Sequence, residues 1–241
     1  MVFSFGILFL NRYNLIKKLR RITVIYEKVT QNKEINAYIN KANELLKAAG
    51  YTDHSKIHTA YVATRASYIL RHFECSQHEI DLVKTASYMH DIGNYIARKH
   101  HAEYGALLAR DLLKQLDLSI EDTVTIVSAI ANHDESTGII VDKVTAALII
   151  ADKSDVRRIR VNDLATVSFD IHDQVNYSVL NNELTISDEN KSINLHLEID
   201  TEICSMYEYL EIFMDRMLMC RKAARTFDYS FHLYVNSSKI L

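Results

Sequence analysis

Apolar residues in the first two thirds of the chain recur at helical spacing. Between positions 35 and 46 they recur three, four and seven residues apart, which marks one face of a helix. Gly50 follows where a helix end favours a left-handed residue, so we expect this helix to end near residue 49. From about 55 to 160 the same spacing predicts helix after helix. The expected buried faces are Val62, Ala63, Ala66, Ile69 and Leu70; Ile80, Val83, Ala86 and Met89; Leu107, Leu108 and Leu112; Val124, Val127, Ile130 and Ala131; and Val144, Ala147, Leu148 and Ala151.

After residue 161 the apolar spacing changes to the two-residue period of half-buried strands. Asn181 and Asn182 tolerate positive φ and predict a hairpin turn, and residues 188–192 predict the next turn. Thr201 is the expected N-cap of a single helix. The alternating strand positions are Leu184 and Ile186; Ile193, Leu195, Leu197 and Ile199; and Phe231, Leu233 and Val235. The apolar face of the helix contains Ile203, Leu210, Phe213, Met217 and Ala224.

These patterns predict a mainly α protein in which a helical bundle is followed by a small C-terminal α+β unit of three or four strands and one helix. We expect an N-terminal helical segment at 1–49, a helical domain at 50–163 and the α+β unit at 164–241. The apolar face of that unit is either its own core or the surface of a homodimer.

Composition agrees with long helices and a balanced surface. The 241 residues include five glycines and no proline, so few positions break a helix. The formal net charge of −3 gives no basic field, and we expect no nucleic-acid partner. Three cysteines without a CxxC pair favour a reducing compartment, and we expect a cytoplasmic protein.

The first 21 residues have their own pattern. The apolar run at 2–10 is shorter than the roughly 20 residues of a membrane span, and a basic cluster follows it rather than preceding it as in a secretory signal. We therefore expect no stable span. A helix packed on the body or a frayed end is one interpretation, and weak attachment to a membrane surface is the other.

Imidazole and carboxylate groups gather near the ends of the predicted helices. Six of them carry the candidate chemistry, since such ligands suit Zn, Mn, Fe or Ni and helical bundles build metal sites from inward-facing side chains. The set is His58, His90, Asp91, His101, His133 and Asp152.

Five short segments, in this order, resemble the HD-domain metal-dependent phosphohydrolases. A single His-Asp dipeptide is weak evidence, because this chain also has one at 133–134 and another at 172–173. The ordered set, with small or apolar residues around each position, is much more specific. The segments are KIH at 56–58, ASYMHDIG at 86–93, HAEYGA at 101–106, IANH at 130–133 and IADK at 150–153.

The resemblance implies a site for two divalent metal ions, with Mn, Fe, Zn, Ni and Mg not distinguished. His58, His90, Asp91 and Asp152 would hold one ion, and Asp91 would bridge to a second ion held by His101 and His133. The two ions would share a hydroxide that attacks a phosphoester or phosphoanhydride. Asp91 and Lys153 would then be catalytic, and Lys153, Arg157 and Arg158, expected along one helix, would bind the substrate phosphates.

The continuation Ile92-Gly93 and the spacing of the five segments resemble the small dinuclear HD hydrolases, which implies a small phosphorylated substrate, a nucleotide or dinucleotide. Departures from other subfamily patterns agree with this. A chain without proline lacks the Gly-Tyr-Pro signature of cyclic dinucleotide phosphodiesterases, and Asp91 is not followed by the Glu-Asp pair of alarmone hydrolases. The α+β unit also resembles a region of uncharacterised bacterial HD proteins.

Several alternatives stay open. A slip of one residue would give the role of His101 to His100. Lys153, Arg157 and Arg158 are otherwise solvated charges, and Asp134 is either a support for a ligand histidine or a solvated carboxylate. The alternative function is a non-catalytic sensor or assembly module that binds metal or nucleotide without turnover.

Overall fold

The computed structural model describes residues 25–161 and 171–241. The apolar run at 2–10 and the basic cluster after it lie outside these ranges. Within them, no helix combines the length and the apolar character that crossing a bilayer requires.

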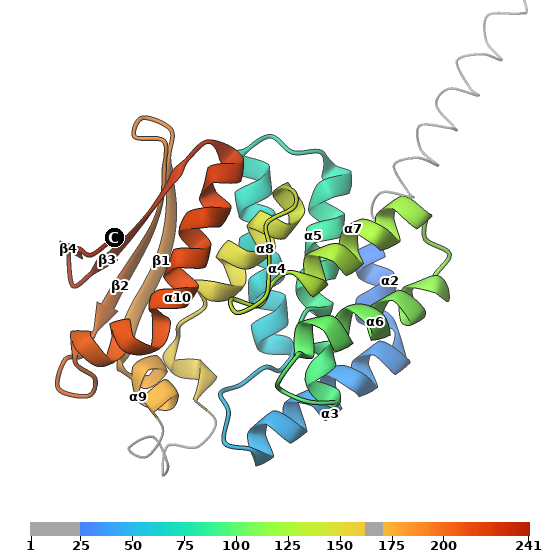
Figure 1. Cartoon of the computed structure of the whole chain (residues 1–241), viewed down its shortest axis with the longest axis horizontal. Helices are drawn as coiled ribbons and strands as arrows, with labels where there is room; N and C mark the ends of the chain where they lie inside the picture. The colour runs from blue at the N-terminus through green and yellow to red at the C-terminus, as the bar shows by residue number, and fades with distance from the viewer. Residues whose placement is uncertain (1–24, 162–170) are drawn as a thin grey trace, which may run out of the picture.

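The described chain is mainly α-helical, with one small sheet near its C-terminus (Figure 1). The predicted fold class is therefore confirmed. The helical elements are α2 (Ile25–Gln31), α3 (Lys33–Ala48), α4 (Lys56–His72), α5 (Gln77–Met89), η1 (Ile92–Tyr95), α6 (His101–Lys114), α7 (Ile120–Ala131), α8 (Lys143–Lys153), η2 (Arg158–Arg160), α9 (Ile171–Ser178), α10 (Met206–Ala224) and η3 (Arg225–Phe227). The strands are β1 (Val179–Ser187), β2 (Ser192–Ile199), β3 (Ser230–Val235) and β4 (Ser238–Lys239).

Local sequence sets where several helices begin and end. The side chain of Ser55 accepts a hydrogen bond from Ile57 N and caps α4, and Ser76 with Glu79 forms a capping box at α5. The predicted end of α3 is confirmed: Ala49 is its C-cap, and Gly50 follows with φ +82°, where a residue with a Cβ would be strained.

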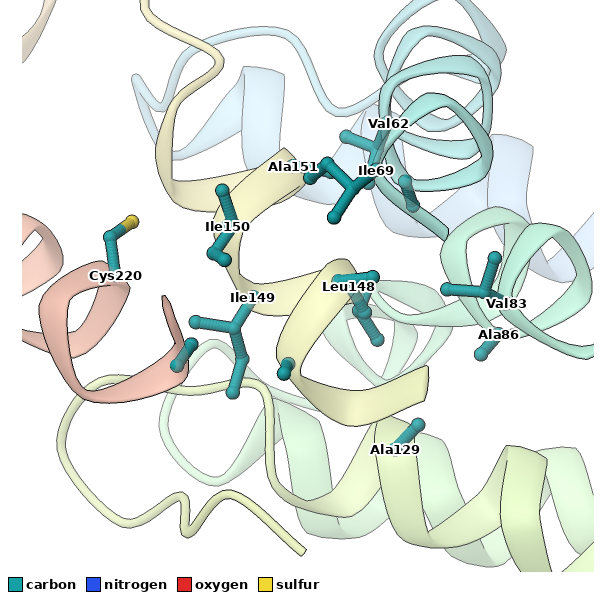
Figure 2. Packing of buried hydrophobic residues seen from close by; sticks show 14 of the residues in the cluster. Val62, Ile69, Val83, Ala86, Ala129, Leu148, Ile149, Ile150, Ala151 and Cys220 are labelled. Carbon is teal, nitrogen blue, oxygen red and sulfur yellow. The ribbon is translucent and has the colours of Figure 1, made fainter. Parts of the chain in front are cut away.

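Helix α8 is the central element of the core. Every residue from Val144 to Ala151 is buried, because the helix is apolar around its whole circumference. Figure 2 shows Leu148 directed towards α4 and α5, while Ile149 lies on the side of Cys220 in α10. The helical bundle and the C-terminal unit therefore bury apolar surface against the same helix.

Two predicted helix faces are partly wrong. Leu107 is 55% exposed on α6 and Val124 is 60% exposed on α7. The α6 face that packs inward is built largely from small residues, which allow helices to approach closely. The position of Leu107 therefore did not indicate the buried face. The buried residues are His101, Ala102, Gly105, Ala106, Ala109, Leu112 and Leu113 of α6, and Ile126, Ala129 and Ile130 of α7.

The sheet has the strand order β1-β2-β3-β4 and carries α10 on one face. β1 and β2 form an antiparallel hairpin, β3 runs parallel to β2 after the α10 crossover, and β4 pairs antiparallel with β3. The predicted alternation in β2 and β3 is confirmed, since Ile193, Leu195 and Leu233 are fully buried. Figure 1 shows α10 between the strands and α8, so the apolar strand positions form a core within the chain.

The predicted hairpin turn at Asn181 and Asn182 is wrong, because both residues lie inside β1, next to a bulge after Val179. Asn182 is used for tertiary contacts instead: its Nδ2 donates to the carbonyls of Ser154 (2.8 Å) and Val156 (2.9 Å), and its Oδ1 accepts from Arg65 (2.8 Å). These bonds tie the strand to the end of α8. The turn predicted after residue 187 does connect β1 to β2.

The start of the C-terminal helix was also predicted wrongly. The N-cap of α10 is Ser205, whose hydroxyl accepts from Glu208 N, while the Glu208 carboxylate accepts from Ser205 N in return. Thr201 and Ile203 lie before the helix. The Ser-x-x-Glu capping box is stronger than an isolated threonine because it satisfies two backbone N–H groups at once.

Candidate metal centre

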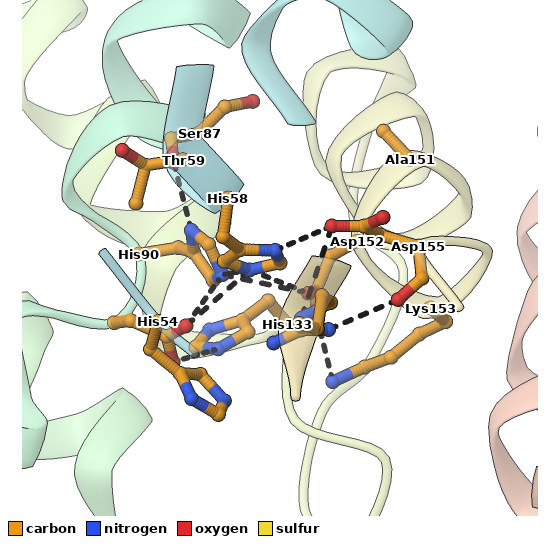
Figure 3. Close-up of polar contacts among 12 residues, drawn as sticks. His54, His58, Thr59, Ser87, His90, His133, Ala151, Asp152, Lys153 and Asp155 are labelled. Carbon is orange, nitrogen blue, oxygen red and sulfur yellow. Dashed lines mark hydrogen bonds and ion pairs between the residues drawn. The ribbon is translucent and has the colours of Figure 1, made fainter. Parts of the chain in front are cut away.

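The side chains of the six predicted ligand residues meet in one place. His58 comes from the first turn of α4, His90 and Asp91 from the end of α5, and His101 from the start of α6. His133 follows α7, and Asp152 is near the end of α8. The four histidines are almost fully buried. Figure 3 shows how His58, His90, His133 and Asp152 converge from separate elements.

Each of the four imidazoles is anchored through its Nδ1 atom. Three of them bond the backbone carbonyl three residues earlier: His90 to Ser87 (2.7 Å), His101 to Arg98 (3.1 Å) and His133 to Ile130 (2.7 Å). The Nδ1 of His58 bonds the Asp155 carboxylate at 2.7 Å. Because a carbonyl or carboxylate oxygen can only accept, Nδ1 carries the proton and the Nε2 lone pair is left facing the centre.

Asp91 lies between two pairs of imidazoles. Its Oδ2 is 3.0 Å from His90 Nε2 and 3.6 Å from His58 Nε2. Its Oδ1 is 3.5 Å from His101 Nε2 and 3.9 Å from His133 Nε2. Each carboxylate oxygen therefore faces a different pair of ring nitrogens, as a ligand shared by two cations would.

Asp152 completes the group on the His58 side. Its Oδ1 is 3.4 Å from His58 Nε2 and 3.5 Å from His90 Nε2. Its Oδ2 forms an ion pair with Lys153 Nζ at 2.9 Å. The lysine thus fixes the carboxylate with one oxygen directed at the imidazoles.

The donor set fits divalent cations. The Nε2 atoms of His58 and His90 are 3.3 Å apart, and those of His101 and His133 are 3.2 Å apart. Two lone pairs at such distances repel unless a proton or a metal ion lies between them. Candidate ligand atoms within 4.8 Å of one another form two overlapping groups, His58, His90 and Asp152, and His90, Asp91 and His133.

The electrostatics of the cluster show the same need for positive charge. Burial alone would lower the pKa of His90, but Asp91 and Asp152 outweigh it and raise that pKa to about 10. Burial, followed by the charges of His90 and His101, lowers the pKa of His133 to about 3. Without metal the cluster therefore stabilises a proton on one imidazole and keeps another neutral.

The structure places His101, and not His100, at the cluster. His100 has a left-handed backbone, and its half-exposed side chain lies 3.5 Å from Glu103. Gly93 brings the two segments together: a Cβ at this position would overlap the carbonyl oxygen of His101 and the backbone of Gly105. The glycine two residues after Asp91 is thus required by the close approach of α6.

The predicted cations have different positions. Lys153 lies at the cluster, but its ammonium is paired with Glu135 (2.7 Å) as well as Asp152. The expected single helix is wrong, because α8 ends at Lys153. Arg157 pairs with Asp155 and lies 3.5 Å from the ring centroid of Tyr61, and Arg158 lies over Tyr177. Arg157 is thus linked to the cluster only through Asp155, which bonds His58, and the described contacts of Arg158 are with Tyr177.

A polar cavity opens above Asp91, His101, His133 and Asp152. Its arginines are Arg98, Arg160 and Arg216, none of which was predicted. His54, from the loop before α4, also lines it. Asp134 lies 3.7 Å from His101 Nδ1.

Comparison with known proteins agrees with this geometry. The family model described as HD domain matches residues 56–160. This segment is an HD domain. HD domains are generally metal-dependent hydrolases and bind divalent metals. The match begins at the first residue of α4 and ends with η2, so it contains all six clustered residues but not α10 or the sheet.

A relative with similarity beyond the HD domain is the uncharacterized protein MJ1020 of Methanocaldococcus jannaschii. The two sequences are 27% identical over 203 residues, which cover 74% of this chain and 77% of the relative. The name of the relative assigns it no activity.

Proposed function

We propose that this protein is a phosphohydrolase that uses two divalent cations to cleave a phosphoester or phosphoanhydride in a small phosphorylated molecule of the nucleotide class. The position of Asp91 carries the proposal, because its two oxygens face separate imidazole pairs at the floor of a cavity. A nucleotide substrate, a cytoplasmic location and a homodimer stay predictions.

The interatomic distances support a division of the ligands between two cations. His58, His90 and Asp152 would hold one cation with Asp91 Oδ2, and His101 and His133 would hold the other with Asp91 Oδ1. Such a pair supplies Lewis acidity, which lowers the pKa of a water molecule and neutralises phosphate charge.

The surrounding residues hold these ligands in place. Carbonyl and carboxylate acceptors fix the ring orientation of each histidine, so little reorganisation is needed when the site is loaded. Lys153 holds Asp152 through one oxygen and is itself held by Glu135. We therefore assign Lys153 the role of positioning Asp152 rather than that of binding substrate.

The experiment is substitution of the shared carboxylate. Asp91→Ala should lose metal and activity together, with kcat/KM reduced by more than about a hundredfold, because both cations lose a ligand. Metal content is measured by elemental analysis. Activity is measured with bis(p-nitrophenyl) phosphate, p-nitrophenyl phosphate and nucleoside polyphosphates in the presence of Mn, Mg, Zn or Ni.

Asp188→Ala is the matched control, since Asp188 is an exposed carboxylate that also accepts from a histidine, His72, at 2.8 Å. It should leave metal content and turnover unchanged. Normal metal content and turnover in Asp91→Ala would contradict the assignment. Bound metal with no turnover of any substrate by the unmodified protein would support the non-catalytic alternative.

A further inference from the structure

Of the lysines and arginines that line the cavity, one comes from outside the segment matched by the HD-domain model. Arg216 lies on α10, 56 residues beyond the end of the matched segment at 160, yet it lines the same cavity as Asp91 and Asp152. Its guanidinium lies over the ring of Phe213 at 4.6 Å from the centroid, and its Nε donates to Glu135 Oε1 at 3.2 Å. The C-terminal unit therefore contributes a charge to this cavity.

Two other cations of the cavity are already occupied. Lys153 is held between Asp152 and Glu135. Arg160 donates through Nε and Nη2 to the carbonyl of Asp53 and through Nη1 to the carbonyl of Asp155. These hydrogen bonds fix the loop before α4 to the segment after α8. Because they use Nε and both Nη atoms, Arg160 has few N–H groups left to bind a ligand.

Arg216 differs from Lys153 and Arg160 because its contacts with described residues use only one edge of its guanidinium. Arg98, the fourth cation, is directed at the HD-domain residues Asn94 and His101 through Nη1. Nε is its one donor with a hydrogen bond to a described residue, and neither Nη group donates to the described part of the chain. The side chain is 21% exposed, which places these donors in a partly desolvated position at the cavity. A guanidinium on an aromatic ring with a free fork has the geometry that binds phosphate or carboxylate through paired N–H groups.

The local charges do not balance once Asp152 is a metal ligand. Glu135 is then the one carboxylate shared by Lys153 and Arg216, since its Oε2 faces the lysine and its Oε1 faces the arginine. Asp134 also acts on the charge of Lys153, but Arg216 shares Glu135 with that lysine and pairs with no other described carboxylate, which leaves part of its positive charge uncompensated. An anion from outside the chain would compensate it.

We propose that Arg216 binds a second anionic group of the substrate, separate from the phosphoryl group at the metal cluster, so that the C-terminal unit forms part of the active site. This inference rests on the proposed function. Glu135 and Lys153 stand between Arg216 and Asp152. Three successive ion pairs thus separate Arg216 from Asp152, which places Arg216 where it suits a group next to the reacting one.

The test compares two ligands that differ in their second anionic group, inorganic pyrophosphate and inorganic phosphate, by titration calorimetry on the Mn-loaded full-length protein. Arg216→Met keeps the length of the side chain and its packing on Phe213 but removes the fork. It should weaken pyrophosphate binding at least tenfold and phosphate binding less than threefold. Arg216→Lys keeps the charge without the fork and should fall between Arg216→Met and the unmodified protein.

Arg221→Met is the matched control, because Arg221 is an exposed arginine on the same helix. It should leave both affinities unchanged. Thermal midpoints of all variants are measured in parallel, and if Arg216→Met unfolds, the ratio of the two affinities in Arg216→Lys carries the test. Equal losses for both ligands, or no loss for pyrophosphate, would overturn the role of Arg216.

Kinetics separate this inference from the proposed function. On a substrate with anionic groups on both sides of the scissile bond, Arg216→Met should raise KM more than it lowers kcat, and on p-nitrophenyl phosphate it should change neither. Turnover that is equally insensitive to Arg216→Met on both substrates would overturn the inference and leave the phosphohydrolase proposal intact. Selective loss of pyrophosphate binding without any turnover would support the inference and contradict the catalytic proposal.

Discussion

The orientation of each of the four clustered imidazole rings depends on the hydrogen bond that its Nδ1 atom makes. Three of them bond the carbonyl oxygen three residues earlier, a local arrangement that a histidine at a helix end adopts without help from distant residues. His58 is different, since it lies inside the first turn of α4 and its Nδ1 bonds Asp155, 97 residues away in sequence. Its orientation therefore depends on the packing of α4 against the end of α8.

Replacement of Asp155 tests this dependence. Asp155→Asn removes the charge that holds the His58 ring, so we expect the dissociation constant for Mn²⁺ to rise about 10- to 100-fold. The measurement is competition with a chelating dye, together with a thermal midpoint to verify folding. Asp188→Asn, which alters a histidine-carboxylate pair at the surface, should leave the constant unchanged. Equal metal affinity in both variants would mean that the Asp155 contact is not needed.

Sequence patterns were most informative for residues that act within their own segment. The six clustered residues sit in short motifs whose order is visible along the chain. Asp155 follows Asp152 by three residues, so the DKSD spacing at 152–155 was an available but unused indication. Arg98 and Arg216 had no such indication, because tertiary packing, not their local sequence, brings them to the cavity.

Among the secondary-structure elements, the errors have a common cause. Helix faces rich in leucine and valine were expected to be buried, yet α6 packs its alanine and glycine face inward and leaves Leu107 exposed. Asparagine in β1 was expected to turn the chain, yet Asn182 bonds two carbonyls near the end of α8. In each case a tertiary partner, which the local pattern does not contain, overrides the intrinsic preference of the residue.

The N-terminus of α10 offers a test of local structure. Ser205→Ala removes the hydroxyl that accepts from Glu208 N, and we expect it to lower the free energy of unfolding by about 1 kcal/mol. Thr201 lies outside the helix, so Thr201→Ala should change the free energy of unfolding by less than about 0.5 kcal/mol. Urea unfolding followed by circular dichroism measures both. A larger loss in Thr201→Ala than in Ser205→Ala would contradict the observed helix start.

For the whole molecule, α8 is the element that joins the two parts. Leu148 packs towards α4 and α5, and Ile149 lies on the α10 side (Figure 2). Loss of α8 would therefore expose core residues both in the helical bundle and in the C-terminal unit. The bonds that join Asn182 to Ser154 and to Arg65 cross the same junction. Although the sequence pattern divides the chain near residue 163, the packing joins both sides of that point.

We expect the two parts to unfold together. Ile149→Ala should lower the free energy of unfolding by about 2–5 kcal/mol, because it leaves a cavity between α8 and α10. Hydrogen exchange at increasing urea should show the peptides of α8 and of β2 opening with the same free energy, in the variant as in the unmodified protein. A C-terminal unit that opens at lower urea than α8 would show that the parts are independent.

The central claim is that Asp91 is shared by two cations at the floor of the cavity. Anomalous diffraction from crystals grown with Mn²⁺, recorded at the manganese edge, tests it most directly. The account predicts two anomalous peaks, one among His58, His90 and Asp152 and the other beside His101 and His133, with an oxygen of Asp91 directed at each. The absence of any peak among these side chains in Mn-saturated crystals would contradict it.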